Sequence, residues 1–456
     1  MKAVTGVLCV GCAAVCLACD ASAAPGDLVW SYQTGDEVWS SPAVGANFVY
    51  WGSNDGKVYA FGGIQQWSYD TGAEVVSSPT VGGGYVYVGS HDGKVYCLDA
   101  ATGSEEWTYT TGGPITSAPA LSGGYVYVAS YDDRVYCLDA ATGAFEWMQS
   151  TLGDLASSPA VVAGRVYVGG YDGAVYGLSA STGDIKWSQW IGAGMPSSPA
   201  VSGAYVYIGS VDGVVYCLSA SNGSVEWTYD TGNVVTSSPA LCDGHVYVGC
   251  WDNKVYCLDA ATGSVEWTYP TSDRVESSPA VSGGYVYAGS YDGWIYCLDA
   301  STGALEWSHQ TLDKVYSSPA VAWGYVYVGS FDGKLYCLEA AEGDPGEWPA
   351  FGRDSQNSHL LPCEIALEEG WNMTGYGYTW DPPVDLAGVT VTDGSAIETW
   401  DSAAAAGWIQ NPAFYYTPAG YRELGRPVPP AHSDRIEPNC GYWLLAYRAG
   451  LTLRIP

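Results

Sequence analysis

The tripeptide Ser-Ser-Pro recurs at a fixed spacing along this chain of 456 residues. It occurs at Ser40-Ser41-Pro42, again 37 residues later at Ser77-Ser78-Pro79, and from there every 40 residues to Pro319, once as Ser117-Ala118-Pro119. A period of this length is typical of a solenoid or a propeller, in which each repeat is one supersecondary unit that packs against its neighbours. The eight copies predict eight such units.

One unit, SSPTVGGGYVYVGSHDGKVYCLDAATGSEEW from Ser77 to Trp107, indicates four short strands. Its β-rich runs are 78–81, 85–90, 94–98 and the run around Trp107. Asp92-Gly93 between two of these runs predicts a hairpin with a type I′ turn, which needs positive φ at both central residues. No run has the apolar spacing of an amphipathic helix. We therefore expect an all-β fold, an eight-bladed β-propeller of four-stranded antiparallel blades.

The predicted strands are apolar on both faces, as in Tyr85-Val86-Tyr87-Val88. Stacking blades around an axis buries both faces of each sheet, which explains this pattern. The outer-strand motif around Trp30 has no blade before it, so we expect it to pair with the last blade and close the ring. Trp348 is the alternative residue for the same place.

Six stretches carry a family resemblance: LDAATGSEEW (98–107), LDAATGAFEW (138–147), LSASTGDIKW (178–187), LSASNGSVEW (218–227), LDAATGSVEW (258–267) and LDASTGALEW (298–307). They resemble the pyrroloquinoline-quinone-like (PQQ-like) repeat, which occurs in quinoprotein dehydrogenases and in BamB, a non-enzymatic scaffold of the outer-membrane β-barrel assembly machine. The resemblance implies a propeller over residues 25–350, and it implies that one tryptophan per unit docks between blades. The tryptophans concerned are Trp30, Trp67, Trp107, Trp147, Trp187, Trp227, Trp267 and Trp307.

The first residues predict export. Lys2, the small apolar run Ala3–Ala18 and Ala21-Ser22-Ala23 read as a signal peptide spanning residues 1–24. The protein is then expected in the periplasm, on the cell surface or outside the cell, with a lipid anchor at Cys19 as the less favoured alternative. A net charge of −32 argues against nucleic acid and anionic membranes as partners.

Six cysteines share one repeat position: Cys97, Cys137, Cys217, Cys257, Cys297 and Cys337. Ala60 and Gly177 fill it elsewhere, so the position requires a small residue. Sheets about 10 Å apart are too distant for a disulfide, so these cysteines are expected to be packing thiols. Cys363 and Cys440, after the repeats, are proposed as a disulfide.

No catalytic or metal-binding constellation is recognisable. The five histidines have no metal-ligand spacing, and the vicinal cysteine pair of quinoprotein alcohol dehydrogenases is absent. Eight aspartates recur in step, from Asp55 and Asp92 to Asp332, and hairpin-turn chemistry explains them better than a calcium ring does. No cofactor is expected. PQQ with calcium, as in a PQQ-dependent dehydrogenase, is the alternative.

Residues that vary between units indicate the functional surface. One set precedes the recurring aspartates at a single end of the barrel, and a second set, which precedes the inner strands, is expected at the same rim. Tyr and Trp are enriched in binding hot spots, so this rim is the candidate protein-interaction surface, with rings that fold back onto the next blade as the alternative. Its residues are His91, Tyr131, Tyr171, Trp251, Tyr291, Phe331, Trp39 and Tyr316. The Ser-Ser positions are expected to line the central tunnel.

The repeat stops after Leu338, and residues 351–362 read as a linker. Residues 363–456 form a small β-rich segment in which Gly370-Trp371-Asn372 and Gly441-Tyr442-Trp443 resemble a module at the C-termini of secreted bacterial proteins. The expected function is that of a secreted, non-catalytic scaffold. A glycan-binding surface protein, with contacts from residues 363–456, is the further alternative.

Overall fold

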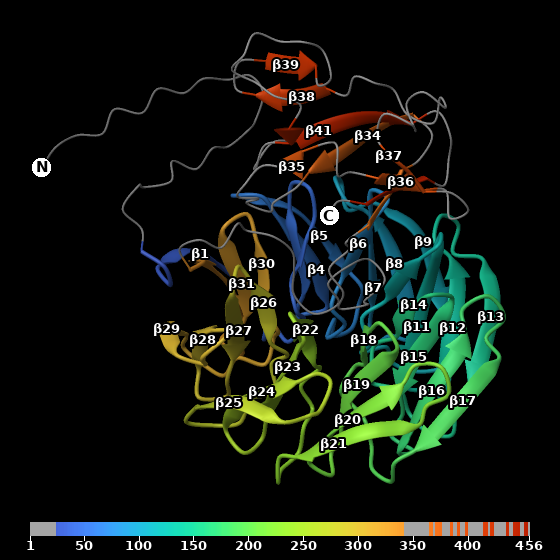
Figure 1. The fold of residues 1–456 in the computed structure, drawn as a ribbon, viewed down its shortest axis with the longest axis vertical. Coiled ribbons are helices and arrows are strands. Elements are labelled where there is room, and N and C mark those ends of the chain that lie inside the picture. Colours follow the sequence, from blue (N-terminus) through green and yellow to red (C-terminus); the bar gives the residue numbers. More distant parts are fainter. Residues whose placement is uncertain are drawn as a thin grey trace, which may run out of the picture.

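The structure is a computed structural model. It describes residues 24–341 in full and the backbone of ten strands between residues 364 and 454. The first of these parts is a ring of four-stranded antiparallel sheets around a central axis (Figure 1). No helix occurs in the described residues. The predicted eight-bladed propeller is confirmed.

The strands of the first four blades follow in chain order from the axis outwards. Blade 1 contains β2 (Ala43–Val44), β3 (Val49–Gly52), β4 (Lys57–Phe61) and β5 (Gln65–Asp70). Blade 2 contains β6 (Thr80–Gly82), β7 (Tyr85–Gly89), β8 (Lys94–Asp99) and β9 (Glu105–Thr110). Blade 3 contains β10 (Ala120–Ser122), β11 (Tyr125–Ser130), β12 (Arg134–Asp139) and β13 (Phe145–Ser150). Blade 4 contains β14 (Ala160–Val162), β15 (Arg165–Gly169), β16 (Ala174–Ser179) and β17 (Ile185–Trp190).

Blades 5 to 7 repeat this order, and blade 8 completes the ring. Blade 5 contains β18 (Ala200–Ser202), β19 (Tyr205–Gly209), β20 (Val214–Ser219) and β21 (Val225–Asp230). Blade 6 contains β22 (Ala240–Cys242), β23 (His245–Cys250), β24 (Lys254–Asp259) and β25 (Val265–Pro270). Blade 7 contains β26 (Ala280–Ser282), β27 (Tyr285–Gly289), β28 (Trp294–Asp299) and β29 (Leu305–Gln310). Blade 8 contains β30 (Ala320–Ala322), β31 (Tyr325–Gly329), β32 (Lys334–Glu339) and, as its outer strand, β1 (Leu28–Gln33).

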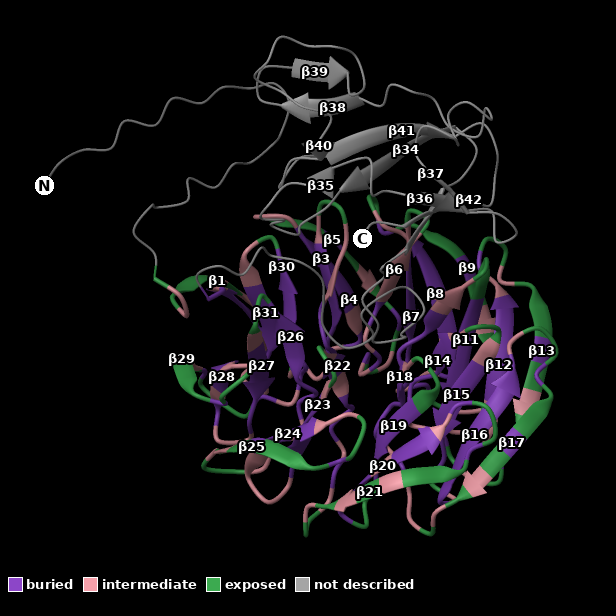
Figure 2. Ribbon diagram, in the orientation of Figure 1, coloured by how far each residue is buried: buried purple, intermediate pink, exposed green. Residues whose placement is uncertain are grey.

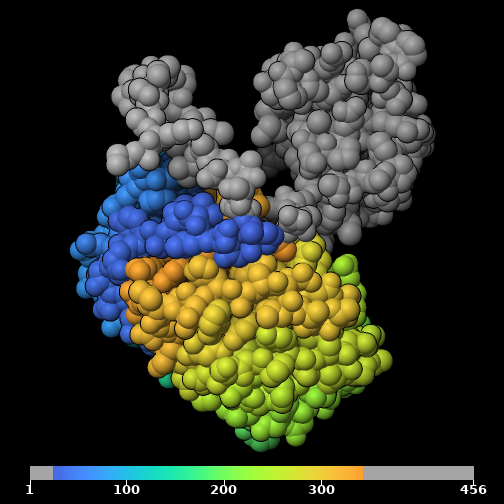
Figure 3. Space-filling model, turned by 90° about the vertical axis from the view of Figure 1, so that its left-hand side faces the viewer, coloured from blue at the N-terminus to red at the C-terminus, as the bar shows by residue number. Residues whose placement is uncertain are grey.

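The N-terminal strand closes the ring, as the sequence predicted. β1 pairs antiparallel with β32, with Trp30 opposite Cys337, so the last blade has no free outer edge. Figure 3 shows this contact from outside, where the blue N-terminal residues lie against the orange end of the propeller. Trp348, the alternative residue, lies outside the described residues.

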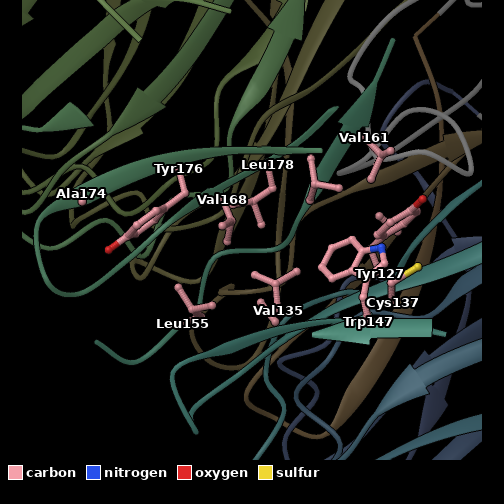
Figure 4. Packing of buried hydrophobic residues seen from close by; sticks show 13 residues of the cluster. Tyr127, Val135, Cys137, Trp147, Leu155, Val161, Val168, Ala174, Tyr176 and Leu178 are labelled. Atoms are coloured by element: carbon pink, nitrogen blue, oxygen red, sulfur yellow. The ribbon is translucent and has the colours of Figure 1, made fainter. Parts of the chain in front are cut away.

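The core lies between blades rather than within one of them. Figure 4 shows the cluster formed by blades 3 and 4, in which Val135 and Leu155 face Val168 and Leu178. The middle strands are buried on both faces, whereas the outer strands alternate and expose every second side chain (Figure 2). The two-sided apolar pattern of the sequence therefore reflects stacking of the blades.

The outer-strand tryptophan of each regular blade reaches into the next one. The Nε1 of Trp107 donates to the carbonyl oxygen of Ala140 at 3.0 Å, and its ring lies on Gly143, where an added Cβ would meet the indole at 2.6 Å. The φ of Gly143 is +70°, so this position needs glycine for two separate reasons. The same donor geometry, with an acceptor 33 residues later, occurs at Trp67, Trp147, Trp187, Trp227 and Trp267.

The closing junction differs in one respect. The ring of Trp307 lies on Gly26, which has a φ of +85° and stands four residues before Trp30, just as Gly143 precedes Trp147. The N-terminal segment thus supplies the glycine of the missing turn. The Nε1 of Trp307, however, has no hydrogen-bond partner among the described residues.

The shared cysteine position is small because the tryptophan of the same blade lies beside it. Cys97 is opposite Trp107 in the β8–β9 pair, and a β-bulge follows at once. At Gly177, the one glycine in this position, an added Cβ would meet Trp187 at 2.4 Å. Burial raises the pKa of the Cys97 thiol to about 12, so it is protonated and unreactive at neutral pH.

Ten strands follow the propeller: β33 (Glu364–Leu367), β34 (Gly370–Gly375), β35 (Val384–Asp385), β36 (Thr390–Thr392), β37 (Ile397–Thr399), β38 (Phe414–Thr417), β39 (Gly420–Glu423), β40 (Arg435–Ile436), β41 (Gly441–Ala446) and β42 (Leu451–Arg454). β34 pairs with β41, which joins the two aromatic motifs of this segment. Four expectations stay predictions, because the residues that would test them lie outside the described ones. They are the separate C-terminal module, the linker at 351–362, the signal peptide and the Cys363–Cys440 disulfide.

Candidate functional site: an axial cavity and its rim

The hairpin tips that form the rim are not type I′ turns, so that prediction was wrong. Between β7 and β8 the loop has four residues, 90–93, and only Gly93 has positive φ, at +80°. The amide of Gly93 donates to the carbonyl of Ser90, which is the pattern of a type I turn followed by a G1 bulge. Oδ1 of Asp92 accepts the amide of Lys94 at 2.9 Å and fixes this geometry. Paired positive φ values occur instead at the other end of the blade, at Gly83 and Gly84.

The recurring aspartates also hold the blades together. Oδ2 of Asp92 accepts the hydroxyl of Tyr96 at 2.7 Å, and the same Asp-to-Tyr contact is made in every blade. At Asp132, Oδ2 additionally accepts the amide of Gly112, which belongs to the preceding blade. Turn and junction contacts therefore account for these carboxylates. No group of three His, Cys, Asp or Glu residues in the described part of the chain could hold a metal ion.

Both variable sets meet at the propeller axis, around a cavity of about 740 Å³ (the axial cavity). All eight residues that precede the inner strands line it: Trp39, Val76, Thr116, Ala156, Pro196, Thr236, Glu276 and Tyr316. Five of the residues that precede the aspartates line it as well: His91, Tyr131, Tyr171, Val211 and Trp251. The volume lies within the roughly 300–1,000 Å³ typical of ligand pockets.

A belt of serines forms the floor of the axial cavity. In the Ser-Ser-Pro motif only the second serine lines the cavity, and the amide of Ser158 donates to Oγ of Ser198 in the next blade at 2.9 Å. The same link recurs around the ring to Ser318, whose amide donates to Oγ of Ser41. The first serine is fully buried, as at Ser77, whose Oγ accepts the amide of Gly89. The expectation that both serines line the tunnel was therefore half right.

The belt has one missing hydroxyl, at Ala118, which replaces the second serine in blade 3. There, Oγ of Ser77 donates to the carbonyl of Ser117 at 2.8 Å and bridges the same two blades one residue earlier. The belt is therefore a structural device, and its hydroxyls are largely used by the protein itself.

On one side of the rim the aromatic rings pack against each other. Trp39 stacks on Phe331 with ring centroids 5.0 Å apart, and Tyr316 lies 5.4 Å from Trp39. Tyr291 contacts both Tyr316 and Phe331 edge-on. Burial raises the pKa of Tyr291 to about 12. These rings fold onto neighbouring blades, so they form a continuous wall rather than separate exposed side chains.

A charged pair is set into this wall. Nε of Arg274 lies 2.7 Å from Oε1 of Glu276, and the guanidinium lies over the rings of Trp251 and Tyr291, 4.4 and 4.1 Å from their centroids. The Glu276 side chain is only 9% exposed. Burial raises its pKa, and the neighbouring Arg274 offsets this only in part. The sequence placed at the rim the residues that precede the inner strands, and Glu276 is one of them. It did not predict the ion pair, because Arg274 belongs to neither variable set.

The opposite side of the rim exposes large apolar side chains, although Asp154 and Asp172 lie beside Tyr171. Loop 191–196 contains no charged residue, and it lies between Trp190, which is 69% exposed, and Tyr171, which is 45% exposed. The amide of Val211 donates to the carbonyl of Gly194. This hydrogen bond holds Val211 beside the loop, where its exposed side chain is the third apolar one. We call Tyr171, Trp190 and Val211 the apolar sector. Trp190 was not predicted, since it lies at the end of an outer strand.

Comparison with known proteins agrees with this architecture. The family model described as outer membrane protein assembly factor BamB matches residues 13–118, 92–210, 189–357 and 252–397. No curated protein sequence matches the chain. In the described part of the chain, no helix is long and apolar enough to cross a membrane.

Three solved structures share the fold. BamB from Moraxella catarrhalis is 21% identical with a TM-score of 0.61, over 69% of this chain and 99% of its own. The computationally designed protein Ika8 is 21% identical with a TM-score of 0.62, over 67% and 97%. A europium-containing methanol dehydrogenase is 14% identical with a TM-score of 0.61, over 69% and 93%. These likenesses establish the fold, and the matches of the family model show that the chain belongs to the BamB-like family of PQQ-like repeat propellers.

Proposed function

We propose that this protein is an exported, non-catalytic scaffold that binds a protein partner at the rim of the axial cavity. The observation that supports this is where the chain departs from its own repeat. Repeated polar groups, such as Asp92 and Ser198, make bonds that join blades or fix turns. The positions that vary converge on one cavity and its rim, where aromatic side chains gather. Aromatic residues flanked by an apolar surface are the usual composition of binding hot spots.

The apolar sector is the part of the rim best suited to a first contact. Trp190 and Tyr171 expose large rings beside a loop without charge, on a protein whose net charge is −32. Exposing such side chains costs solvation free energy unless a partner covers them. A partner that docks here would also meet the mouth of the axial cavity, because Tyr171 and Val211 belong to both surfaces.

The dehydrogenase alternative requires the axial cavity to hold a quinone and calcium. Calcium takes six to eight oxygen ligands, chiefly carboxylates and carbonyls. Among the described residues that line the axial cavity, Glu276 is the one carboxylate, and a single carboxylate supplies at most two of these ligands. The remaining lining is aromatic, aliphatic and hydroxyl-bearing. These residues do not fit a calcium-bound quinone, so we derive no reaction through one.

Site-specific photo-crosslinking in the producing cell tests the scaffold function. A crosslinking amino acid at Trp190 or Tyr171 should give one defined protein adduct, and the same group at Thr108, exposed on the outer strand of blade 2, should give none. Equal adducts at all three positions would show that the rim has no special role. Titration of the purified protein with PQQ and calcium by calorimetry tests the alternative, and tight binding that raises thermal stability would favour the dehydrogenase.

A further inference from the structure

The axial cavity is electrically one-sided. Among the described residues that line it, Glu276 is the only carboxylate, and there is no lysine or arginine. His91 also lines it, and its Nδ1 lies 3.1 Å from Glu74. The carboxylate of Glu276 therefore lines the cavity whereas its ion-pair partner Arg274 does not, and the Glu276 side chain is more than nine-tenths buried. Charge complementarity favours a cationic ligand.

The aromatic wall around Glu276 already accepts cations. The guanidinium of Arg274 lies over Trp251 and Tyr291, and the ammonium of Lys314 lies over Tyr291 and Phe331, 5.4 and 5.9 Å from the ring centroids. Ring faces attract cations through their quadrupole, most strongly for tryptophan. Two tryptophans, Trp39 and Trp251, line the cavity itself. The chain's own cations thus show which chemistry this wall selects.

Glu276 is poorly explained by stability alone. Burial raises its pKa although Arg274, Lys314 and a hydrogen bond with Tyr291 act to lower it, so the carboxylate is less favourably placed in the folded protein than in water. The Arg274 side chain is 34% exposed and lies on two rings, so it does not depend on Glu276 for solvation. Charges that cost stability are found where function needs them.

We propose that the axial cavity binds a basic side chain, a lysine ammonium or an arginine guanidinium, presented by the protein partner. Glu276 provides the counter-charge, and Trp39, Trp251 and Tyr316 provide the surrounding aromatic lining. A cavity of about 740 Å³ holds such a side chain together with neighbouring residues of an extended segment. This inference rests on the proposed function, because the cation is a side chain of the protein partner. It adds that the partner presents a lysine or an arginine at the axial cavity.

Two peptides test it without the partner. The probes are N-acetyl-Gly-Arg-Gly-amide and the same peptide with citrulline, which has the shape of arginine and no charge. Dissociation constants are measured by calorimetry, up to millimolar peptide, in ~0.15 M salt, where the general field of an acidic protein is screened beyond about 8 Å. We expect the arginine peptide to bind about tenfold or more tightly than the citrulline peptide, since a charge-assisted contact is lost.

Matched variants locate the site. Glu276→Gln should abolish the preference for arginine, whereas Glu266→Gln, which removes the same charge from the exposed outer strand of blade 6, should leave it unchanged. Equal affinity for both peptides, no binding of either, or equal loss in both variants would overturn the inference. The crosslinking experiment at Trp190 and Tyr171 is independent of these outcomes, so the rim function can stand when the cavity assignment fails.

Discussion

Two carboxylates in neighbouring repeats have opposite environments. Asp252 belongs to the β23–β24 hairpin of blade 6, where burial is outweighed by hydrogen bonds from Lys254 and Tyr256, and its pKa is lowered. Glu276 belongs to the rim, and burial raises its pKa although Arg274 is adjacent. The difference teaches that the repeated parts of the chain stabilise the ring. At the varied position of Glu276 the chain carries a charge that burial disfavours.

The largest effect should follow removal of a junction tryptophan. Trp107→Ala should lower the free energy of unfolding by about 4 kcal/mol, because a buried indole leaves a cavity between two blades. Trp39→Ala at the rim should cost about half as much, since this ring is only half-buried and its loss opens toward the axial cavity. Chemical denaturation measures both. Equal losses would show that the rim is as structural as the junctions.

Glycine substitutions separate close contact from backbone strain. Gly143→Ala should cost about 3 kcal/mol, because the new methyl group meets the Trp107 ring at 2.6 Å and φ is +70°. Gly123→Ala should cost about 1 kcal/mol, because φ is +59° there and nothing lies within 4 Å. Thermal unfolding of the two variants gives the comparison. A similar melting temperature for both would mean that the indole moves aside freely.

Neutralising the two carboxylates should have different effects on stability at pH 7. Asp252→Asn should lower the free energy of unfolding by about 1–2 kcal/mol, since its charge is partly buried and hydrogen-bonded. Glu276→Gln should leave stability unchanged or raise it slightly, since this buried charge is unfavourable.

The pH dependence of these two effects follows from the pKa directions. A lowered pKa stabilises the fold above the unfolded value, 3.8 for Asp252, so the cost of Asp252→Asn should begin to shrink as the pH falls through 3.8 and should vanish only below the lowered pKa of the folded state. A raised pKa favours the fold below the unfolded value, 4.5 for Glu276, so any gain from Glu276→Gln should vanish there and grow as the pH rises. Urea unfolding over a series of pH values from 7 downwards through 3.8 checks both signs, and a loss for Glu276→Gln at pH 7 would contradict the assigned role.

The smallest effect concerns the closing junction. Trp107→Phe loses the indole hydrogen bond to Ala140, whereas Trp307→Phe has no such bond to lose among the described residues. The first should therefore be about 1 kcal/mol more destabilising than the second. Denaturation midpoints measured under identical conditions resolve this difference, and equal costs would show that the two junctions are equivalent.

Much of the ring was readable from the sequence because the repeat states its contacts many times over. The period, the small residue beside each tryptophan and the closing role of Trp30 are each set by local spacing. The turn at Asp92-Gly93 was misassigned because an Asp-Gly pair fits two turn types. The bond from Oδ1 of Asp92 to the amide of Lys94 decides between them.

The rim was only partly readable for a different reason. Its residues are not repeated, and their neighbours come from other blades, so no spacing along the chain shows that Arg274 lies on Trp251 or that Trp39 stacks on Phe331. In the same way, the ring of Trp190 stays exposed because the adjacent glycines of loop 191–196 have no side chains that could cover it.

The sequence by itself determined the architecture: eight units, four strands in each, and an N-terminal strand that completes the last blade. It could do so because the geometry of a blade depends on residues close together in the sequence, and the same pattern is repeated in every unit. Only the tertiary structure decided what the ring encloses, namely a cavity whose single carboxylate is set among aromatic rings. Closing the ring brings one side chain from every blade to the axis, and their combined burial and charge exist only there.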